Sequence, residues 1–402
     1  MSGAFVPYGG YWSSPFARWQ GSLAHLHSLA FGAWLARRSL AALDVDTTLI
    51  DAGVLGTTVP QRGAFYGLPW VAAMAGLPGL AGPTVSQACA TAARCVALAA
   101  QEVATGASAC SLVLTADRVS NGPQLYYPDP RGPGGTGEHE SWVTGNFERD
   151  PWTSQPMLRT AENVAARFGI GMAQQHELAL HRYAQYADAL ADDSAFHRRF
   201  MALPFDVPDA RFTRTLSTLH GDEGIHPTTR EGLSRLKPVL PDGTVSYGAQ
   251  THPADGSAGL LVATRERARQ LSRQPEVQVE ILATAQARTD AAQMPYAPVP
   301  AARQAMARAG LDFTALQAVT THNPFVVNDI VLAHETGLDA FTMNRFGCSL
   351  VWGHPQAPTG LRAVIELIET LEIRGGGVGL FTGCAAGDSA MAVVLRVDDA
   401  RP

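Results

Sequence analysis

The chain has 402 residues, of which 46% are hydrophobic and 16% charged, and its formal net charge is −6. A chain of this size and composition buries a large core and exceeds one ordinary compact unit, so two or more subdomains are expected. The negative charge excludes a general attraction to nucleic acid or anionic membranes. No apolar run approaches the roughly 18 residues that span a bilayer, and the first residues lack the features of a signal peptide, so a cytoplasmic protein is expected.

The cysteines predict free thiols. They form no CxxC pair and no Cys/His zinc spacing, and an odd number is a poor disulfide framework; they are Cys89, Cys95, Cys110, Cys348 and Cys384. We therefore expect no metal site. No permanently bound cofactor is expected either. For Cys95 and Cys110 the expected role is that of a small buried side chain.

The first half of the chain predicts alternating helices and strands. Residues 27–51 predict an amphipathic helix followed by a short strand, and residues 84–118 predict a strand, an Ala-rich helix and a second strand. This βαβ unit places Cys89 at the turn from strand to helix. There the positive end of the helix dipole favours a thiolate, and backbone N–H groups can face a developing oxyanion.

The middle of the chain predicts an excursion from this pattern. From residue 119 to about 160 the sequence is dense in Gly, Pro and aromatic residues, which is typical of a long surface loop with a functional role. Residues 160–200 predict a pair of helices with Thr160 as the N-cap of the first. Periodicity is then lost until about residue 245.

The second half repeats the style of the first. Alternating, sheet-like sequence returns at 245–264, and a strand–helix–strand–helix pattern resumes from 277. The segment NRFGCSLVWGHPQAPTG places His354 just before a strongly periodic helix, and GGGVGLFTGCAAGDSAMAVVLRV predicts two strands around a tight turn near Cys384. Two α/β halves that each present a reactive residue at a helix start indicate a pseudo-symmetric site between them.

Six segments, in order and at compatible spacings, resemble the thiolase family. They are PFARWQGSLA, VSQACATAARC, TAENVAARFGI, TTREGLSRLKPVLPDGTV, GHPQAPTG and GCAAGDSA. The resemblance implies a five-layered αβαβα fold of two similar halves with an inserted loop domain. The N-terminal half is then 1–118 with 246–268, the loop domain 119–245 and the C-terminal half 269–402, and a homodimer or homotetramer is implied.

The resemblance also implies a reaction. A thiolase cleaves a 3-oxoacyl-CoA with coenzyme A, or runs the reverse Claisen condensation, and coenzyme A is a substrate. A cysteine thiolate suits acyl transfer because it is both a good nucleophile and a good leaving group. By resemblance Cys89 becomes acylated, His354 is the base that takes its proton, and Cys384 is the acid/base at the α-carbon.

The same resemblance assigns the groups that hold the oxyanions. The segment THNPFVVND stands where the family has NEAF, so His322 replaces the usual Asn, as in members with HDCF, and can still donate a hydrogen bond. The alternative is a structural loop histidine. The other hole uses the backbone N–H groups of Cys89 and Ala386, the latter in place of a Gly.

Substrate recognition is expected from five positions that match the family's coenzyme A segments, and several departures suggest a reshaped acyl pocket. The five are Met157, His226, Ser246, Thr251 and Phe325. Trp352 and Gln356 are bulkier or more polar than the usual residues. Trp352, together with the aromatic loop residues Tyr126, Tyr127 and Trp142, suggests a branched, aromatic or dicarboxylic acyl group. Alternatives are a thiolase-like aldolase, a noncatalytic acyl-CoA-binding subunit, or dependence on a small zinc-ribbon/OB-fold partner.

Overall fold

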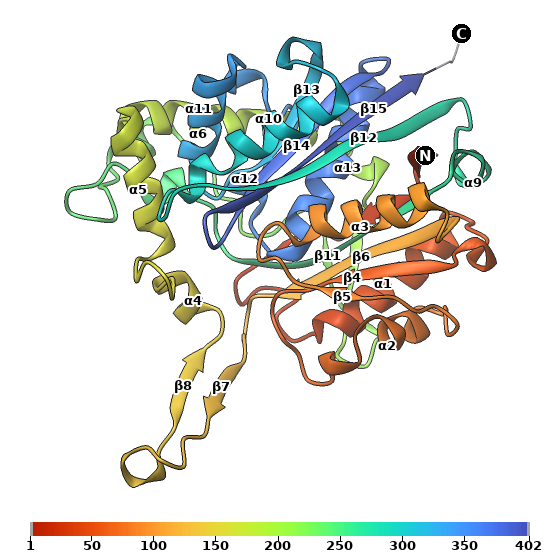
Figure 1. Ribbon diagram of the computed structural model, residues 1–402, viewed down its shortest axis with the longest axis horizontal. Helices are drawn as coiled ribbons and strands as arrows, with labels where there is room; N and C mark the ends of the chain where they lie inside the picture. Colours follow the sequence, from red (N-terminus) through yellow and green to blue (C-terminus); the bar gives the residue numbers. More distant parts are fainter. Residues whose placement is uncertain (1–2, 400–402) are drawn as a thin grey trace.

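A computed structural model describes residues 3–399 and shows two similar half-sheets joined along one edge (Figure 1). In the N-terminal half, β4, β5 and β6 are parallel and β11 is antiparallel to β6. In the C-terminal half, β13 and β14 are parallel, and β15 and β12 continue antiparallel. The strand β1 (Ala4–Pro7) joins the halves by pairing with β12 and touching β11.

The strand bounds follow the two halves. The N-terminal half contains β2 (Tyr11–Ser13), β3 (Ala17–Arg18), β4 (Ala52–Gly56), β5 (Thr84–Val85), β6 (Cys110–Arg118) and β11 (Ala254–Ala263). The C-terminal half contains β12 (Val277–Arg288), β13 (Leu316–His322), β14 (Gly377–Ala385) and β15 (Ser389–Asp399). Their near-continuous buried apolar runs are those of strands covered on both faces.

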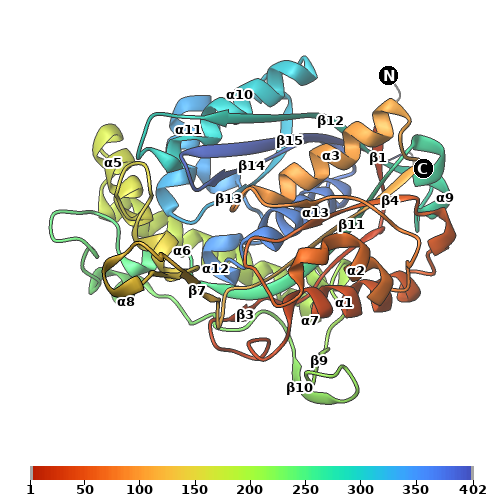
Figure 2. The ribbon, with the colours of Figure 1, turned by 60° about the horizontal axis from the view of Figure 1, so that its bottom comes forward.

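Helices form the three remaining layers, so the order is α–β–α–β–α (Figures 1 and 2). The central layer contains α3 (Thr91–Thr105) and α13 (Ala357–Ile373), which pack against each other between the half-sheets. One outer layer contains α1 (Ser28–Ala42) and α2 (Gly67–Met74), and the other contains α10 (Pro298–Ala309) and α11 (Val326–Thr336). The expected five-layered fold is confirmed.

The central helices approach each other closely because the residues at their contact have small side chains. A Cβ atom on Gly360 would lie 3.2 Å from Ala92 of α3 and 3.2 Å from Phe381 of β14. Nearly all of α13 is buried, so this contact fixes the position of its N-terminus. Since the reactive residues lie at the starts of these two helices, the same packing sets the distance between them.

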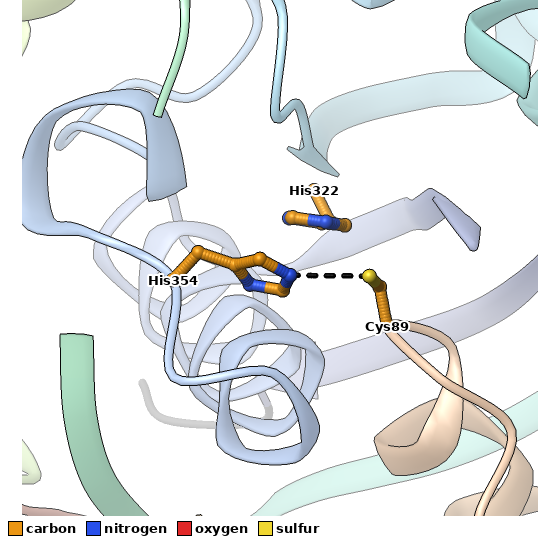
Figure 3. Close-up of side chains that lie close together, drawn as sticks. All are labelled: Cys89, His322 and His354. Atoms are coloured by element: carbon orange, nitrogen blue, oxygen red, sulfur yellow. Dashed lines mark hydrogen bonds between the residues drawn. The ribbon is translucent and has the colours of Figure 1, made fainter. Parts of the chain in front are cut away.

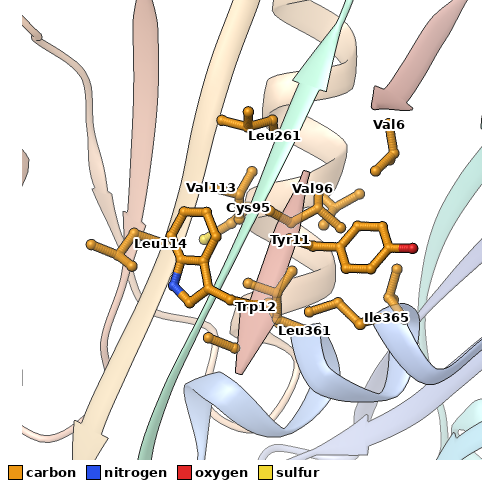
Figure 4. Packing of buried hydrophobic residues seen from close by; sticks show 14 of the residues in the cluster. Val6, Tyr11, Trp12, Cys95, Val96, Val113, Leu114, Leu261, Leu361 and Ile365 are labelled. Carbon is orange, nitrogen blue, oxygen red and sulfur yellow. The ribbon is translucent and has the colours of Figure 1, made fainter. Parts of the chain in front are cut away.

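The core beside these helices is a continuous apolar cluster. Figure 4 shows Val96 of α3 with Leu361 and Ile365 of α13 beside the Tyr11 ring of β2. Cys95 is fully buried and has the structural role expected of it. Among residues 3–399, no helix is long and apolar enough to cross a bilayer.

The insertion between the halves begins with a hairpin that projects from the body of the molecule (Figure 1). Its elements are β7 (Gln124–Tyr127), β8 (Glu138–Ser141), α4 (Thr144–Glu148), α5 (Met157–Phe168), α6 (Met172–Ala189), α7 (Ala191–Ser194), β9 (Phe205–Pro208), β10 (Thr215–Leu219) and α8 (Arg230–Ser234). Two further short helices are α9 (Arg265–Leu271) and α12 (Ser349–Trp352). A buried ion pair between Asp222 and Arg362 ties the insertion to α13.

Two expectations about local structure are wrong. Thr160 is not an N-cap, because α5 begins at Met157 with Pro156 before it, and the Thr160 hydroxyl donates to the Met157 carbonyl inside the first turn. The strand expected at the end of 27–51 is β4, which begins only at Ala52 after a short 3₁₀ turn capped by Asp46. Pro156 directly precedes α5, and Asp46 caps the 3₁₀ turn that comes before β4.

Candidate active site

Cys89 lies in the turn that leads into α3, two residues before the helix begins. Ala88 has a positive φ of 45°, which turns the chain sharply. The Thr91 hydroxyl holds this turn, because it accepts the Gln87 N–H at 2.8 Å and donates to the Ala88 carbonyl at 2.7 Å. The Cys89 side chain is thereby presented at the end of the central helix and is 7% exposed.

His354 reaches the same point from the other half. It follows Gly353, whose φ is 93°, and precedes α13. Its Nε2 lies 3.1 Å from the Cys89 sulfur, and its Nδ1 lies 2.6 Å from the Thr359 hydroxyl (Figure 3). When Nδ1–H donates to Thr359, Nε2 is the acceptor that can take the thiol proton.

Burial keeps this pair neutral at rest. It raises the pKa of Cys89 to about 12, although the N–H groups of Ala386 and of Cys89 itself act on the sulfur and lower it. Burial also holds the pKa of His354 well below its usual value. A neutral thiol and a neutral imidazole are therefore the resting state, and charge is created only when the proton moves.

His322 lies against His354 with its ring nearly parallel. The ring centroids are 4.1 Å apart and the planes differ by 29°. Its Nδ1 is 3.0 Å from the Ser349 hydroxyl, and its Nε2 is buried without a partner in the described residues. Burial lowers the pKa of His322 to about 3, so this ring is neutral too.

A polar network behind His322 fixes its neighbours. The Asn323 amide donates to Asp329 at 2.7 Å, and its carbonyl oxygen accepts from the Ser349 hydroxyl at 3.1 Å. Asp329 is in turn paired with Arg182 in a buried ion pair at 2.8 Å. Such a fully partnered buried network holds a site rigid.

Cys384 comes from the end of β14. Its neighbour Gly383 pairs in parallel register with His322, so the two strands end side by side. Cys384 is fully buried, and burial, followed by the nearby Cys89, raises its pKa well above the usual value, while the Asn328 amide donates to its sulfur and lowers it. The two sulfurs thus lie near enough for the charge of one to act on the pKa of the other.

A single cavity is lined by Cys89, His354 and three of the five expected substrate-binding residues. The cavity has a volume of about 340 Å³ and includes Met157, Thr251 and Phe325. A second cavity of about 200 Å³ adjoins it, lined by Ala88 and Ala386, with Phe147, Met157 and Gln356 common to both.

The remaining two expected substrate-binding residues are not in this cavity. Ser246 is fully buried and bonded to His176 at 2.7 Å, so it is not available to a ligand there. His226 is exposed and lines a separate cavity beside α6. A role for His226 at the far end of coenzyme A stays a prediction.

The Cys89, His322 and His354 cluster contains the ligand types of a zinc site. One donor atom from each lies within 4.8 Å of the others. However, two imidazoles that direct lone pairs at one ion have planes that both pass through it, and these rings are stacked at 4.1 Å. The 3.1 Å contact between sulfur and nitrogen is also that of a hydrogen bond, so the arrangement fits proton transfer better than metal binding.

Two residues that hold the site were missed at the sequence level. Thr359 orients His354, and Asp117 at the end of β6 accepts the N–H of Ala357 at 2.9 Å and that of Val59 at 3.0 Å. Asp117 thus anchors the start of α13 to the N-terminal half. A lone carboxylate ending the apolar run SLVLTAD was the signal that could have identified it.

Comparisons with known proteins identify related sequences. Two family models match, "Thiolase, N-terminal domain" at residues 12–266 and "Thiolase, C-terminal domain" at residues 275–397. The chain is 28% identical to the acetyl-CoA acetyltransferase of Pseudomonas aeruginosa over 94% of its length and 96% of the relative's. It is 30% identical to the 3-ketoacyl-CoA thiolase of Pseudoalteromonas translucida over 82% of each chain.

Solved structures show the same fold. The human mitochondrial 3-ketoacyl-CoA thiolase in complex with CoA superposes with a TM-score of 0.87 and 24% identity over 98% of both chains. The Bacillus anthracis acetyl-CoA acetyltransferase gives a TM-score of 0.88 and 23% identity over 99% of both chains. Because the two family models together match most of the chain, the protein belongs to the thiolase family of acyltransferases.

Proposed function

We propose that the protein cleaves a 3-oxoacyl-CoA with coenzyme A to acetyl-CoA, or another acyl-CoA, and a shortened acyl-CoA, or runs the reverse condensation, through an acyl group on Cys89. The observation that carries this proposal is the 3.1 Å contact between the Cys89 sulfur and His354 Nε2 in a buried cavity. The names of the relatives, acetyl-CoA acetyltransferase and 3-ketoacyl-CoA thiolase, and the CoA-bound human structure support it.

In the cleavage direction, the Cys89 proton moves to His354 Nε2 and the thiolate attacks the 3-oxo carbon. The oxyanion that forms is stabilised by the backbone N–H groups of Cys89 and Ala386, which already act on the sulfur. The carbon–carbon bond then breaks, which leaves the acyl group on Cys89 and an enolate of the smaller thioester.

Cys384 is the proposed acid for that enolate. Its proton goes to the enolate carbon and releases acetyl-CoA, and the thiolate left behind takes the proton of the incoming coenzyme A thiol. The coenzyme A thiolate attacks the acyl group on Cys89, which leaves with the proton held by His354. His322 and His354 are the proposed donors to the enolate oxygen. For His322 this requires the Ser349 hydroxyl to turn from the Asn323 carbonyl to Nδ1, which leaves the His322 proton on Nε2.

The second cavity is the proposed chamber for the acyl tail. Its walls include Trp142, whose indole N–H donates to the Thr58 carbonyl at 2.8 Å and fixes the ring. The residues that line the two cavities include no Lys or Arg. We therefore favour an uncharged branched or aromatic tail, since a dicarboxylic tail would bury its charge without a partner.

Self-association is also proposed, as a homodimer or homotetramer. The strand β5 is an open sheet edge that leads directly into the Cys89 turn. Phe65 and Tyr66 are exposed and shortly precede Leu68, whose N–H bonds to Thr84 of β5. Open edges of this kind are usually covered. Light scattering tests the assembly. A small zinc-ribbon/OB-fold partner and a cytoplasmic location stay predictions from the sequence alone.

Thiolysis of a panel of 3-oxoacyl-CoAs, followed at the enolate absorption, tests the proposed function. The panel covers short, long, branched, aromatic and dicarboxylic acyl chains. We expect turnover that depends on coenzyme A, is lost in Cys89→Ala, and favours uncharged branched or aromatic chains. A noncatalytic subunit would give no turnover with any substrate, and an aldolase would give cleavage that does not need coenzyme A.

A further inference from the structure

Gln356 is a second hydrogen-bond partner of the nucleophilic sulfur. Its Oε1 accepts the Cys89 S–H at 3.3 Å, beside the His354 Nε2 at 3.1 Å. The side chain is buried, and it stands in the wall between the two cavities. Its amide nitrogen has no hydrogen-bond partner within residues 3–399.

The backbone at Gln356 is strained. Its φ of 65° and ψ of −107° belong to a region that glycine adopts freely and other residues rarely do. The turn is held there by the Ala357 N–H bonded to Asp117 at 2.9 Å and by the Thr359 N–H bonded to the Gln356 carbonyl at 3.2 Å. Strain that the surroundings maintain at a reactive centre indicates a functional reason for the side chain.

The Gln356 side-chain amide contains a hydrogen-bond acceptor for the Cys89 thiol and a hydrogen-bond donor for the Cys89 thiolate. While the sulfur carries its proton, the carbonyl Oε1 accepts it, as observed. When the proton moves to His354 Nε2, the sulfur becomes an anion, and a carbonyl dipole facing it would be repulsive. Rotation about the terminal torsion, which has a broad and nearly two-fold profile, exchanges Oε1 for the N–H₂ group of similar shape.

We propose that Gln356 is a catalytic residue that stabilises the Cys89 thiolate by turning its amide to donate an N–H to the sulfur. The proton passes from Cys89 to His354, no other bond changes, and the bond to the anion is charge-assisted and therefore stronger than the one it replaces. This inference extends the proposed function, since it concerns the activation of the same nucleophile before any acyl group is bound.

The test is the rate at which iodoacetamide alkylates Cys89, measured from pH 6 to 9 without coenzyme A and located by peptide mapping. Gln356→Leu removes both polar groups, and Gln356→Glu keeps the shape but cannot donate once ionised. We expect alkylation roughly 10-fold slower in Gln356→Leu at every pH. Gln356→Glu is slower still above the pKa of the new carboxyl, and recovers toward lower pH.

A purely steric role makes a different prediction, because glutamate and glutamine have nearly the same shape. Gln356→Glu would then match the wild type, and that result, or an unchanged rate in Gln356→Leu, overturns the proposal. Gln101→Leu on the exposed face of α3 controls for the substitution type, and melting temperatures show that each variant is folded. The alkylation assay contains no acyl-CoA, so it reports on Gln356 even if no thiolysis is found. Likewise, a negative alkylation result leaves the thiolysis result valid.

Discussion

The orientation of His354 depends on one hydroxyl, and Thr359→Val removes it without changing the shape of the side chain. The Thr359 hydroxyl lies 2.6 Å from His354 Nδ1, and Thr359 is fully buried, so no water replaces it. Leaving a buried donor unpaired costs about 1–3 kcal/mol. The imidazole can regain this energy only by turning away or by moving its proton to Nε2, where it no longer accepts from Cys89.

We therefore expect Thr359→Val to slow acylation of Cys89 by roughly 5- to 150-fold, since 1.4 kcal/mol corresponds to a factor of ten. KM should change little, because Thr359 is not among the residues lining the two cavities. Rapid-quench measurement of acyl transfer from an acyl-CoA gives the rate, and Thr359→Ser, which keeps the hydroxyl, should remain near the wild type. An acylation rate in Thr359→Val equal to that of Thr359→Ser would refute the reasoning.

Three further predictions follow from the same geometry. Cys384→Ala should still accept an acyl group on Cys89 but lose carbon–carbon cleavage by roughly 10²- to 10⁴-fold, measured by peptide mass and by thiolysis; equal loss of both activities would contradict its role. Because burial raises the pKa of Cys89 to about 12, alkylation of the wild type should rise about tenfold per pH unit from pH 7 to 9; a plateau near neutral pH would show a preformed thiolate. Burial raises the pKa of Asp117 from 3.8 to about 6, so the folded state binds this proton more tightly than the unfolded state and the group adds stability as pH falls from about 6 to 4. Relative to Asp117→Asn, the wild type should gain roughly 3 kcal/mol over this range in urea unfolding, and an unchanged difference would contradict the raised pKa.

The fold could be predicted because its signals are repetitive and local. The Ala-rich helix after Cys89 and the periodic helix after His354 are each preceded by a strand and a turn, and both became the central helices α3 and α13. Boundaries were less accurate at Thr160 and at the start of β4. There the choice among nearby capping residues depends on contacts that periodicity does not contain.

The candidate site was only partly predictable, for a physical reason. Cys89 and His354 could be predicted because each is a reactive residue type at the start of a helix. Asp117 and Thr359 act through contacts that exist only once the chain has folded. Gln356 was noticed as a departure from the family's usual residue, but its contact with the sulfur depends on an unusual backbone conformation. A role for Ser246 in substrate binding stays a prediction, because its buried hydroxyl lies 2.7 Å from His176 and the sequence does not show this contact.

The central claim is that one sulfur in this molecule receives an acyl group directly from coenzyme A. Incubation of the wild-type protein with acyl-CoA, brief proteolysis at low pH and peptide mass spectrometry measure this most directly. The account predicts a single added acyl group on the peptide that contains Cys89, removed when free coenzyme A is supplied. An acyl group found on another residue, or none at all with substrates that the protein binds, would contradict it.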